Sequence, residues 1–131
     1  MKAYLSVPII ANRSLDVARL MARAIEAAGL ELISPWVITD QEIRPAKSVN
    51  IFTRDKAAVE DCDVIVADVS KPSTGVGMEV MIAYHGGKRI VLAARVGSTV
   101  TRMLTDMAEA EWVYFADEES LTKGLEEKLK A

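Results

Sequence analysis

Residues 63–88 read DVIVADVSKPSTGVGMEVMIAYHGGK, and this stretch defines the architecture. Its first seven residues are largely apolar and rich in β-branched side chains, which is typical of a strand buried on both faces of a sheet. A short polar loop follows, and then an apolar helix from about Gly77 that ends at Gly86 and Gly87. A strand that leads through a loop into a helix is the unit from which parallel α/β sheets are built.

The same alternation of strands and helices continues in both directions from this unit. We therefore predict a single α/β domain over residues 1–131, with a Rossmann- or flavodoxin-like three-layer fold and a mainly parallel sheet of about five strands. The predicted strands are 2–7, 30–34, 63–69, 89–94 and 111–116, and the other predicted helices are 14–29, 48–62, 99–109 and 118–130.

Composition excludes several classes of function. The chain has 131 residues, of which 50% are hydrophobic, and a net charge of −3. Nucleic acids and anionic membranes require a basic surface, so we expect neither as a partner. The single cysteine, Cys62, and the single histidine, His85, provide neither an intrachain disulfide nor a usual zinc site. With no apolar run of about 18 residues and no signal-peptide pattern at the N-terminus, we expect a cytoplasmic protein without a membrane span.

The loop at 70–77 is the first candidate binding site, because parallel α/β sheets bind ligands at the carboxyl ends of their strands. Gly75 and Gly77 would let the backbone approach a ligand closely, and N–H groups at the start of a helix attract anions. Ser73 adds a hydroxyl group. A tight turn with a capping serine explains this pattern equally well, and no Gly-Lys-Ser/Thr sequence follows to make it a Walker loop.

Three polar residues occupy positions where a core would favour apolar ones. Glu79 is expected in the first turn of the apolar helix, and Asp55 lies on the apolar stripe of helix 48–62. Tyr4 shares one face of the first strand with Ser6. A surface glutamate, a helix-edge aspartate and a core tyrosine are the alternative interpretations. The stripe around Asp55 consists of Ile51, Phe52, Ala58, Val59 and Cys62.

Taken together, the segments AYLSVPI, FTRDKAAVEDCDVIVADVS and KPSTGVGMEVMIAYHGGKRIVL resemble the nucleoside 2-deoxyribosyltransferase superfamily, and within it the nucleoside 5′-monophosphate N-glycosidases. The resemblance implies that Glu79 is the catalytic nucleophile, that Asp55 assists at the base and leaving group, and that Tyr4 positions the nucleophile. It also implies catalysis without a metal ion or an organic cofactor. Carboxylates suit this chemistry, because cleavage of the C1′–N bond passes through an oxocarbenium-like state.

The resemblance also bears on the substrate's 5′ group. The transferases typically carry an aspartate for the sugar 5′-hydroxyl six residues before the nucleophile, and this chain has Ser73 there. A serine beside glycine amides would accept a phosphate that a carboxylate would repel, which favours a nucleoside 5′-monophosphate over a nucleoside. Pro8 and Ile10 stand where the monophosphate hydrolases carry a serine and an arginine, so the phosphate ligands of the first loop differ here.

A partner subunit is expected to complete the site. In the resembled hydrolases a serine from the partner of a homodimer touches the phosphate, and Ser98 or Thr101 would take that part here. Exposed apolar residues are predicted near Met81 and Met103, and they also favour a homodimer. Trp36 follows the second strand and would either stack on a base or cover the sheet edge.

The sequence leaves three functions open. The first is hydrolysis of nucleoside 5′-monophosphates to a free base and a sugar phosphate. The second is transfer of the sugar to another base, and the third is nucleotide binding without turnover. Fold alone does not separate them, and the residues leave both the base and the choice of ribose or 2-deoxyribose open.

Overall fold

The computed structural model describes residues 1–9, 15–39 and 47–130, and it confirms the predicted α/β class. Its five strands are all parallel and lie in the order β2-β1-β3-β4-β5, which is the flavodoxin-like order. The strands are β1 (Lys2–Ser6), β2 (Glu31–Leu32), β3 (Val64–Asp68), β4 (Arg89–Arg95) and β5 (Ala110–Phe115).

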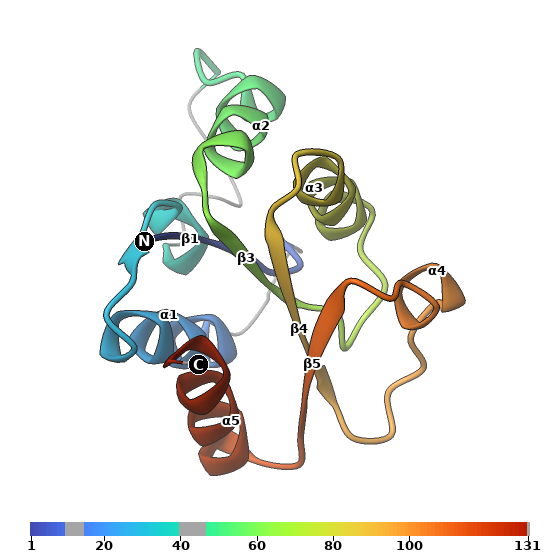
Figure 1. The fold of residues 1–131 in the computed structure, drawn as a ribbon. Helices are drawn as coiled ribbons and strands as arrows, with labels where there is room; N and C mark the ends of the chain where they lie inside the picture. Colours follow the sequence, from blue (N-terminus) through green and yellow to red (C-terminus); the bar gives the residue numbers. More distant parts are fainter. Residues whose placement is uncertain (10–14, 40–46, 131) are drawn as a thin grey trace.

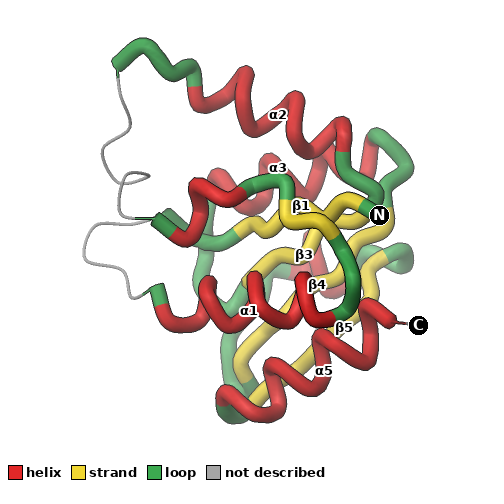
Figure 2. The backbone as a smooth tube through the Cα atoms, turned by 90° about the vertical axis from the view of Figure 1, so that its left-hand side faces the viewer, coloured by secondary structure: helices red, strands yellow, loops and turns green. Residues whose placement is uncertain are grey.

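Helices cover both faces of this sheet, as Figures 1 and 2 show. Helices α1 (Asp16–Ala27) and α5 (Glu118–Lys130) pack side by side on one face, and α2 (Ile51–Asp61) and α3 (Thr74–His85) lie together on the other. A short helix, α4 (Arg102–Thr105), and a 3-10 helix, η1 (Pro35–Ile38), complete the described elements. The result is the three-layer arrangement that the sequence predicts.

The core consists of two apolar clusters, one on each face of the sheet. The period-2 alternation of a strand explains the division, because Leu5 enters the α1–α5 cluster whereas Tyr4 enters the α2–α3 cluster. In β3 every residue from Val64 to Ala67 is fully buried, as expected of a central parallel strand.

Element boundaries differ from the sequence prediction most clearly in α3. The helix begins at Thr74 rather than near Gly77, because Ser73 has extended backbone and its Oγ accepts the N–H of Val76 at 3.3 Å as an N-cap. Gly75 and Gly77 therefore lie within the first helical turn, not in a turn before it. Glu79 consequently lies in the second turn of α3, not in the first.

Three other elements are shorter than predicted. The helix expected over 99–109 is only α4, because the Thr101 side chain caps it late and the chain turns again after Asp106. The helix predicted from residue 48 begins at Ile51, where Asn50 accepts the Thr53 N–H. Strand 30–34 is reduced to β2, since Pro35 starts η1 immediately afterwards.

Strands β1 and β3 form the switch point of the sheet. β1 is followed by a connection to β2 on one side, whereas β3 is followed by a connection to β4 on the other. This divergence leaves space at the carboxyl ends of β1 and β3, where open α/β sheets bind ligands. In the described part of the chain, no helix is long and apolar enough to cross a membrane.

Candidate active site

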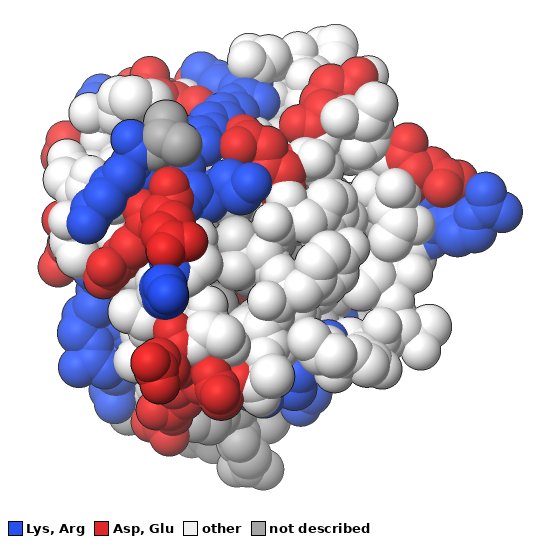
Figure 3. All heavy atoms as spheres, turned by 60° about the horizontal axis from the view of Figure 1, so that its bottom comes forward, with Lys and Arg blue, Asp and Glu red and all other residues white. Residues whose placement is uncertain are grey.

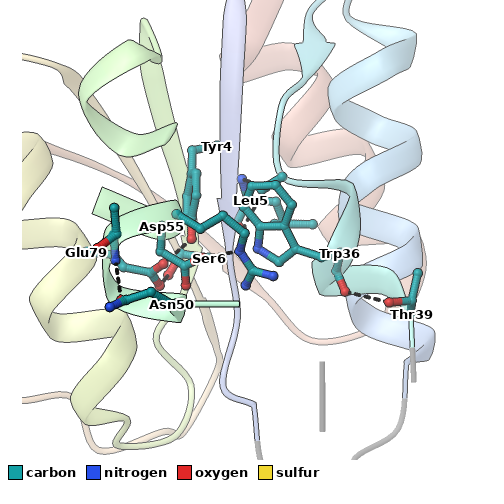
Figure 4. Close-up of polar contacts among 11 residues, drawn as sticks. Tyr4, Leu5, Ser6, Trp36, Thr39, Asn50, Asp55 and Glu79 are labelled. Atoms are coloured by element: carbon teal, nitrogen blue, oxygen red, sulfur yellow. Dashed lines mark hydrogen bonds and ion pairs between the residues drawn. The ribbon is translucent and has the colours of Figure 1, made fainter. Parts of the chain in front are cut away.

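Glu79 is held by two hydroxyl groups of β1 at the carboxyl end of the sheet (Figure 4). The Tyr4 hydroxyl donates a hydrogen bond to Oε2, and Ser6 Oγ donates one to Oε1 at 2.8 Å. Tyr4 and Ser6 are each 1% exposed, and they are two residues apart on one face of the strand. Both oxygens of the carboxylate are therefore fixed from a rigid central strand.

Burial changes the acidity of this carboxyl group. The pKa of Glu79 is raised from 4.5 to about 7, and burial is the largest cause. The hydrogen bonds from Tyr4 and Ser6 lower this pKa, whereas the neighbouring Asp55 raises it. The pKa of the Tyr4 hydroxyl is raised by burial and by the Glu79 charge, so Tyr4 remains a donor. Glu79 thus changes its charge near neutral pH, as a catalytic carboxyl group often does.

Asp55 comes to the site from α2, and its carboxylate lies beside that of Glu79 (Figure 4). Asp55 Oδ1 accepts a hydrogen bond from Arg54 Nε at 2.9 Å, and the two side chains are 21% and 24% exposed. The predicted inward stripe of α2 is only partly correct. Val59 and Cys62 are fully buried, but Ile51 and Phe52 are 40% and 56% exposed because they face an open cavity instead of the core.

Trp36 lies on the other side of β1 from Glu79, and its ring is occupied from two directions (Figure 4). The guanidinium carbon of Arg54 lies 4.1 Å from the ring centroid, and Tyr4 meets the indole edge-on with centroids 6.4 Å apart. Among the described residues its buried Nε1 has no hydrogen-bond partner. A base could therefore not stack on the Arg54-covered face without displacing the guanidinium, which favours the alternative of a cover over the sheet edge.

A cavity of about 330 Å³ opens in front of the two carboxyl groups. It lies between α2 and α3, and most of its wall is apolar, as in many small-molecule sites. Ser73 and Gly75 stand at its α3 end, so the predicted glycine-serine segment does border the cavity that contains Glu79. The remaining lining residues are Val7, Ile9, Ile51, Phe52, Asp55, Lys56, Val76, Met78, Glu79 and Ile82.

The N-terminus of α3 offers donors to this cavity. The first N–H groups of a helix have no acceptor within the helix, and the space beside Gly75 is open, since a Cβ atom there would meet nothing within 4 Å. Ser73 Oγ accepts the Val76 N–H, yet its hydroxyl hydrogen is still available to a ligand. Gly77 points to a different cavity on the opposite flank of α3.

That second cavity, of about 510 Å³, also contains Thr101. The Thr101 hydroxyl caps α4 by accepting the Met103 N–H at 3.3 Å, and Ser98 lies in the turn after β4. Neither residue lines the cavity of Glu79 within one chain. Pro8 is half-buried, two residues after the end of β1, and does not line that cavity either, whereas Ile10 lies outside the described residues.

Two residues of the site were missed by the sequence interpretation. Ser6 could have been found from its position two residues after Tyr4 on one strand face, which places both hydroxyls at the same neighbour. Arg54 carried no such signal, because consecutive helix residues point about 100° apart and only the bend of its long side chain brings it to Asp55.

Comparison with known proteins yields a family that covers most of this chain. The sequence pattern of the family described as nucleoside 2-deoxyribosyltransferase matches residues 3–111, which include all three of Tyr4, Asp55 and Glu79. The chain belongs to this family. A protein of Methanococcoides burtonii named "Putative 2′-deoxynucleoside 5′-phosphate N-hydrolase 1" is 32% identical over 109 residues, covering 79% of this chain and 88% of that protein. A protein of the same name from Thermofilum pendens is 34% identical over 98 residues, covering 72% of this chain and 68% of its own length.

Solved structures show the same fold at lower sequence identity. The CMP N-glycosidase BcmB of Clostridium botulinum superposes with a TM-score of 0.69 at 20% identity, covering 95% of this chain and 98% of that one. A 2-deoxyribosyltransferase of Bacillus psychrosaccharolyticus gives a TM-score of 0.71 at 20% identity, covering 93% and 90% of the two chains. Both structures share the fold of this chain over nearly all of its length.

Proposed function

We propose that this protein hydrolyses the N-glycosidic bond of (2-deoxy)nucleoside 5′-monophosphates and that Glu79 is the nucleophile. The observation that carries the proposal is the Glu79 carboxylate, bound at both oxygens by Tyr4 and Ser6 and placed next to Asp55 at the wall of a cavity. A second observation supports the substrate class. Relatives over most of this chain's length bear the name of 2′-deoxynucleoside 5′-phosphate N-hydrolases.

The residues divide the reaction into two steps. In the first, a Glu79 oxygen bonds to C1′ while the C1′–N bond breaks, and its electron pair leaves with the base. Asp55, beside Glu79, assists the departing base in taking up a proton. In the second step water cleaves the glycosyl ester, which releases the sugar phosphate and restores the carboxylate. Tyr4 keeps Glu79 in line throughout.

The substrate phosphate is assigned to the N-terminus of α3. Ser73 borders the Glu79 cavity and can donate its hydroxyl hydrogen, and the helix start adds N–H groups and a positive dipole end. A free nucleoside would leave these donors without an anion. We therefore expect monophosphates to be better substrates than nucleosides.

A homodimer is part of the proposal. Along α3, Met78 and Met81 are 49% and 52% exposed, and Met103 of α4 is 80% exposed. The surface of the molecule includes a broad area without charged side chains (Figure 3). A second copy of the chain would cover these exposed methionines and bring Ser98 or Thr101 to the phosphate of its partner's site.

The experiment is base release from a panel of nucleosides and their 5′-monophosphates, followed by chromatography with and without an added acceptor base. We expect free base and sugar phosphate from monophosphates, at a rate that the acceptor leaves unchanged. Formation of a new nucleoside or nucleotide on addition of the acceptor would establish the transferase instead. Binding of nucleotides without release of base from any of them would contradict enzymatic function.

A further inference from the structure

Ser6 makes a contact that the proposed reaction does not by itself require. One hydroxyl, that of Tyr4, already binds the carboxylate at Oε2, yet Ser6 Oγ binds the second oxygen, Oε1, at 2.8 Å. Both donors come from one face of β1, and the backbone of both residues is paired with the central strand β3, Tyr4 with Ile65 and Ser6 with Ala67. They are therefore more rigid than donors on a loop would be.

Two hydrogen bonds, one to each oxygen, restrict rotation of the carboxylate more than one hydrogen bond does. A carboxylate held at one oxygen can still rotate about its Cγ–Cδ bond, since that terminal torsion is broad. Donors at Oε1 and Oε2 together fix the carboxylate plane. Ser6 is 1% exposed, so water cannot replace its hydroxyl without a change in the packing of the strand.

We propose that Ser6 is a positioning residue that fixes the plane of the Glu79 carboxylate, so that one defined oxygen faces C1′ of the substrate. This inference rests on the proposed function of Glu79 and extends it to a residue that acts only through Glu79. Ser6 does not line the cavity, so its effect on a substrate bound there would pass through Glu79.

Ser6 also affects the pKa of Glu79, and this electrostatic effect is distinct from its positioning role. From β1, Tyr4 and Ser6 face its carboxylate, and from α2 the Asp55 carboxylate does so with Arg54 bound to it. Lys56 of α2 also borders the cavity, but its ammonium is paired with Glu60 at 3.0 Å. Removal of the Ser6 hydroxyl raises the pKa of Glu79, because that bond stabilises the ionised form. A positioning role predicts a further loss of kcat, which ionisation of Glu79 at high pH does not restore.

The test compares Ser6→Ala with Ser34→Ala. Ser34 is a matched control, since it is the other fully buried polar residue of the described chain and binds only the backbone of Leu5. For Ser6→Ala we expect kcat on a nucleoside 5′-monophosphate to fall about tenfold with KM nearly unchanged, the size expected for one hydrogen bond to a charged group. The loss should persist about two pH units above the Glu79 pKa, where the carboxylate is ionised.

A second measurement is independent of turnover. Carbon-13 NMR of the Glu79 carboxyl carbon should give a higher pKa in Ser6→Ala than in wild type and an unchanged pKa in Ser34→Ala. Ser6→Thr, which keeps a hydroxyl, should retain both the wild-type pKa and most of kcat. Full recovery of kcat in Ser6→Ala at high pH, or equal kcat losses in Ser6→Ala and Ser34→Ala, would overturn the positioning role. Failure of the proposed function would appear differently, as absence of base release from the wild-type protein while the NMR shift remained.

Discussion

The two flanks of α3 border two different cavities. Residues 75, 79 and 82 border the cavity of about 330 Å³ that contains both carboxyl groups, whereas residues 74, 77 and 81 border the cavity of about 510 Å³. Helical spacing of three and four residues produces this division. The cavity on the first flank also contains Asp55 of α2, a second carboxyl group beside Glu79. Among the described residues, the wall of the second cavity contains no carboxyl side chain. This contrast favours chemistry at the Glu79 flank and a partner molecule at the Met81 flank.

The largest effect on activity is expected from removal of the Glu79 carboxylate, which lies on the first flank. We expect Glu79→Gln to lower kcat by at least about a thousandfold, because the amide is no longer a nucleophile. The fold should persist, since Gln fills the same space and can still accept the Tyr4 hydrogen bond. The measurement is base release from a monophosphate, with circular dichroism as the control for folding. Activity within about tenfold of wild type would remove Glu79 from the nucleophile's role.

The raised pKa of Glu79 predicts opposite pH dependences of stability and activity. A carboxyl group whose pKa is higher in the folded state contributes stability below its unfolded value of 4.5, and that contribution is lost as the pH rises through about 7. Activity should rise over the same interval, because the nucleophile must be ionised.

Urea unfolding of wild type and Glu79→Gln provides the measurement. Between about pH 5 and about pH 9, we expect Glu79→Gln to gain roughly 2 to 3 kcal/mol in free energy of unfolding relative to wild type. Comparison of the two proteins at each pH cancels the contributions of all other titrating groups. A constant difference across this interval would mean that Glu79 titrates at its ordinary pKa and that the flank is not desolvated.

A negative charge introduced on the Met81 flank tests the proposed dimer. We expect Met81→Glu and Met103→Glu each to weaken self-association by about 30-fold or more, because a carboxylate would be buried in an apolar interface. Val96→Glu is the control, since Val96 is 63% exposed but lines neither cavity. Sedimentation at several concentrations measures the effect. A wild-type protein that is monomeric and fully active would contradict the dimer, and equal weakening in all three variants would move the interface elsewhere.

The smallest effect is expected at Ser73, which borders both cavities. Ser73→Asp keeps a good N-cap but adds a negative charge, so monophosphate turnover should fall by about tenfold while the nucleoside is spared. The ratio of kcat/KM for the two substrates measures this selectivity. An unchanged ratio would indicate that Ser73 serves only as the cap of α3 and would leave the phosphate to other residues.

The fold was predictable because its signals are local and repeated. β3 and β4 contain continuous apolar runs, and strands alternate with helices along the chain, which together specify a parallel α/β sheet. The start of α3 was predicted too late because two glycines suggested a turn. The Ser73 cap overrides their low helix propensity, which costs only about 1 kcal/mol per residue.

The candidate site was predictable in part. Tyr4, Asp55 and Glu79 stood out as polar residues at apolar positions, and the structure brings all three together. Ser6 could have been found from its spacing after Tyr4, whereas the contact of Arg54 with Asp55 depends on the bend of a long side chain, which residue spacing does not specify. The stacking of Arg54 on Trp36 likewise joins α2 to η1, and no local pattern in the sequence predicts that contact.

Capture of the glycosyl–enzyme ester is the sharpest test of Glu79 as the nucleophile. The protein is mixed with a deoxynucleoside 5′-monophosphate, quenched with acid within the first turnover, and analysed by mass spectrometry of the intact chain and of its peptides. We predict a mass increase equal to one sugar phosphate less one molecule of water, located on Glu79 and absent from Glu79→Gln. Rapid release of base by wild type, with the added mass on another residue or an undiminished rate in Glu79→Gln, would contradict this role.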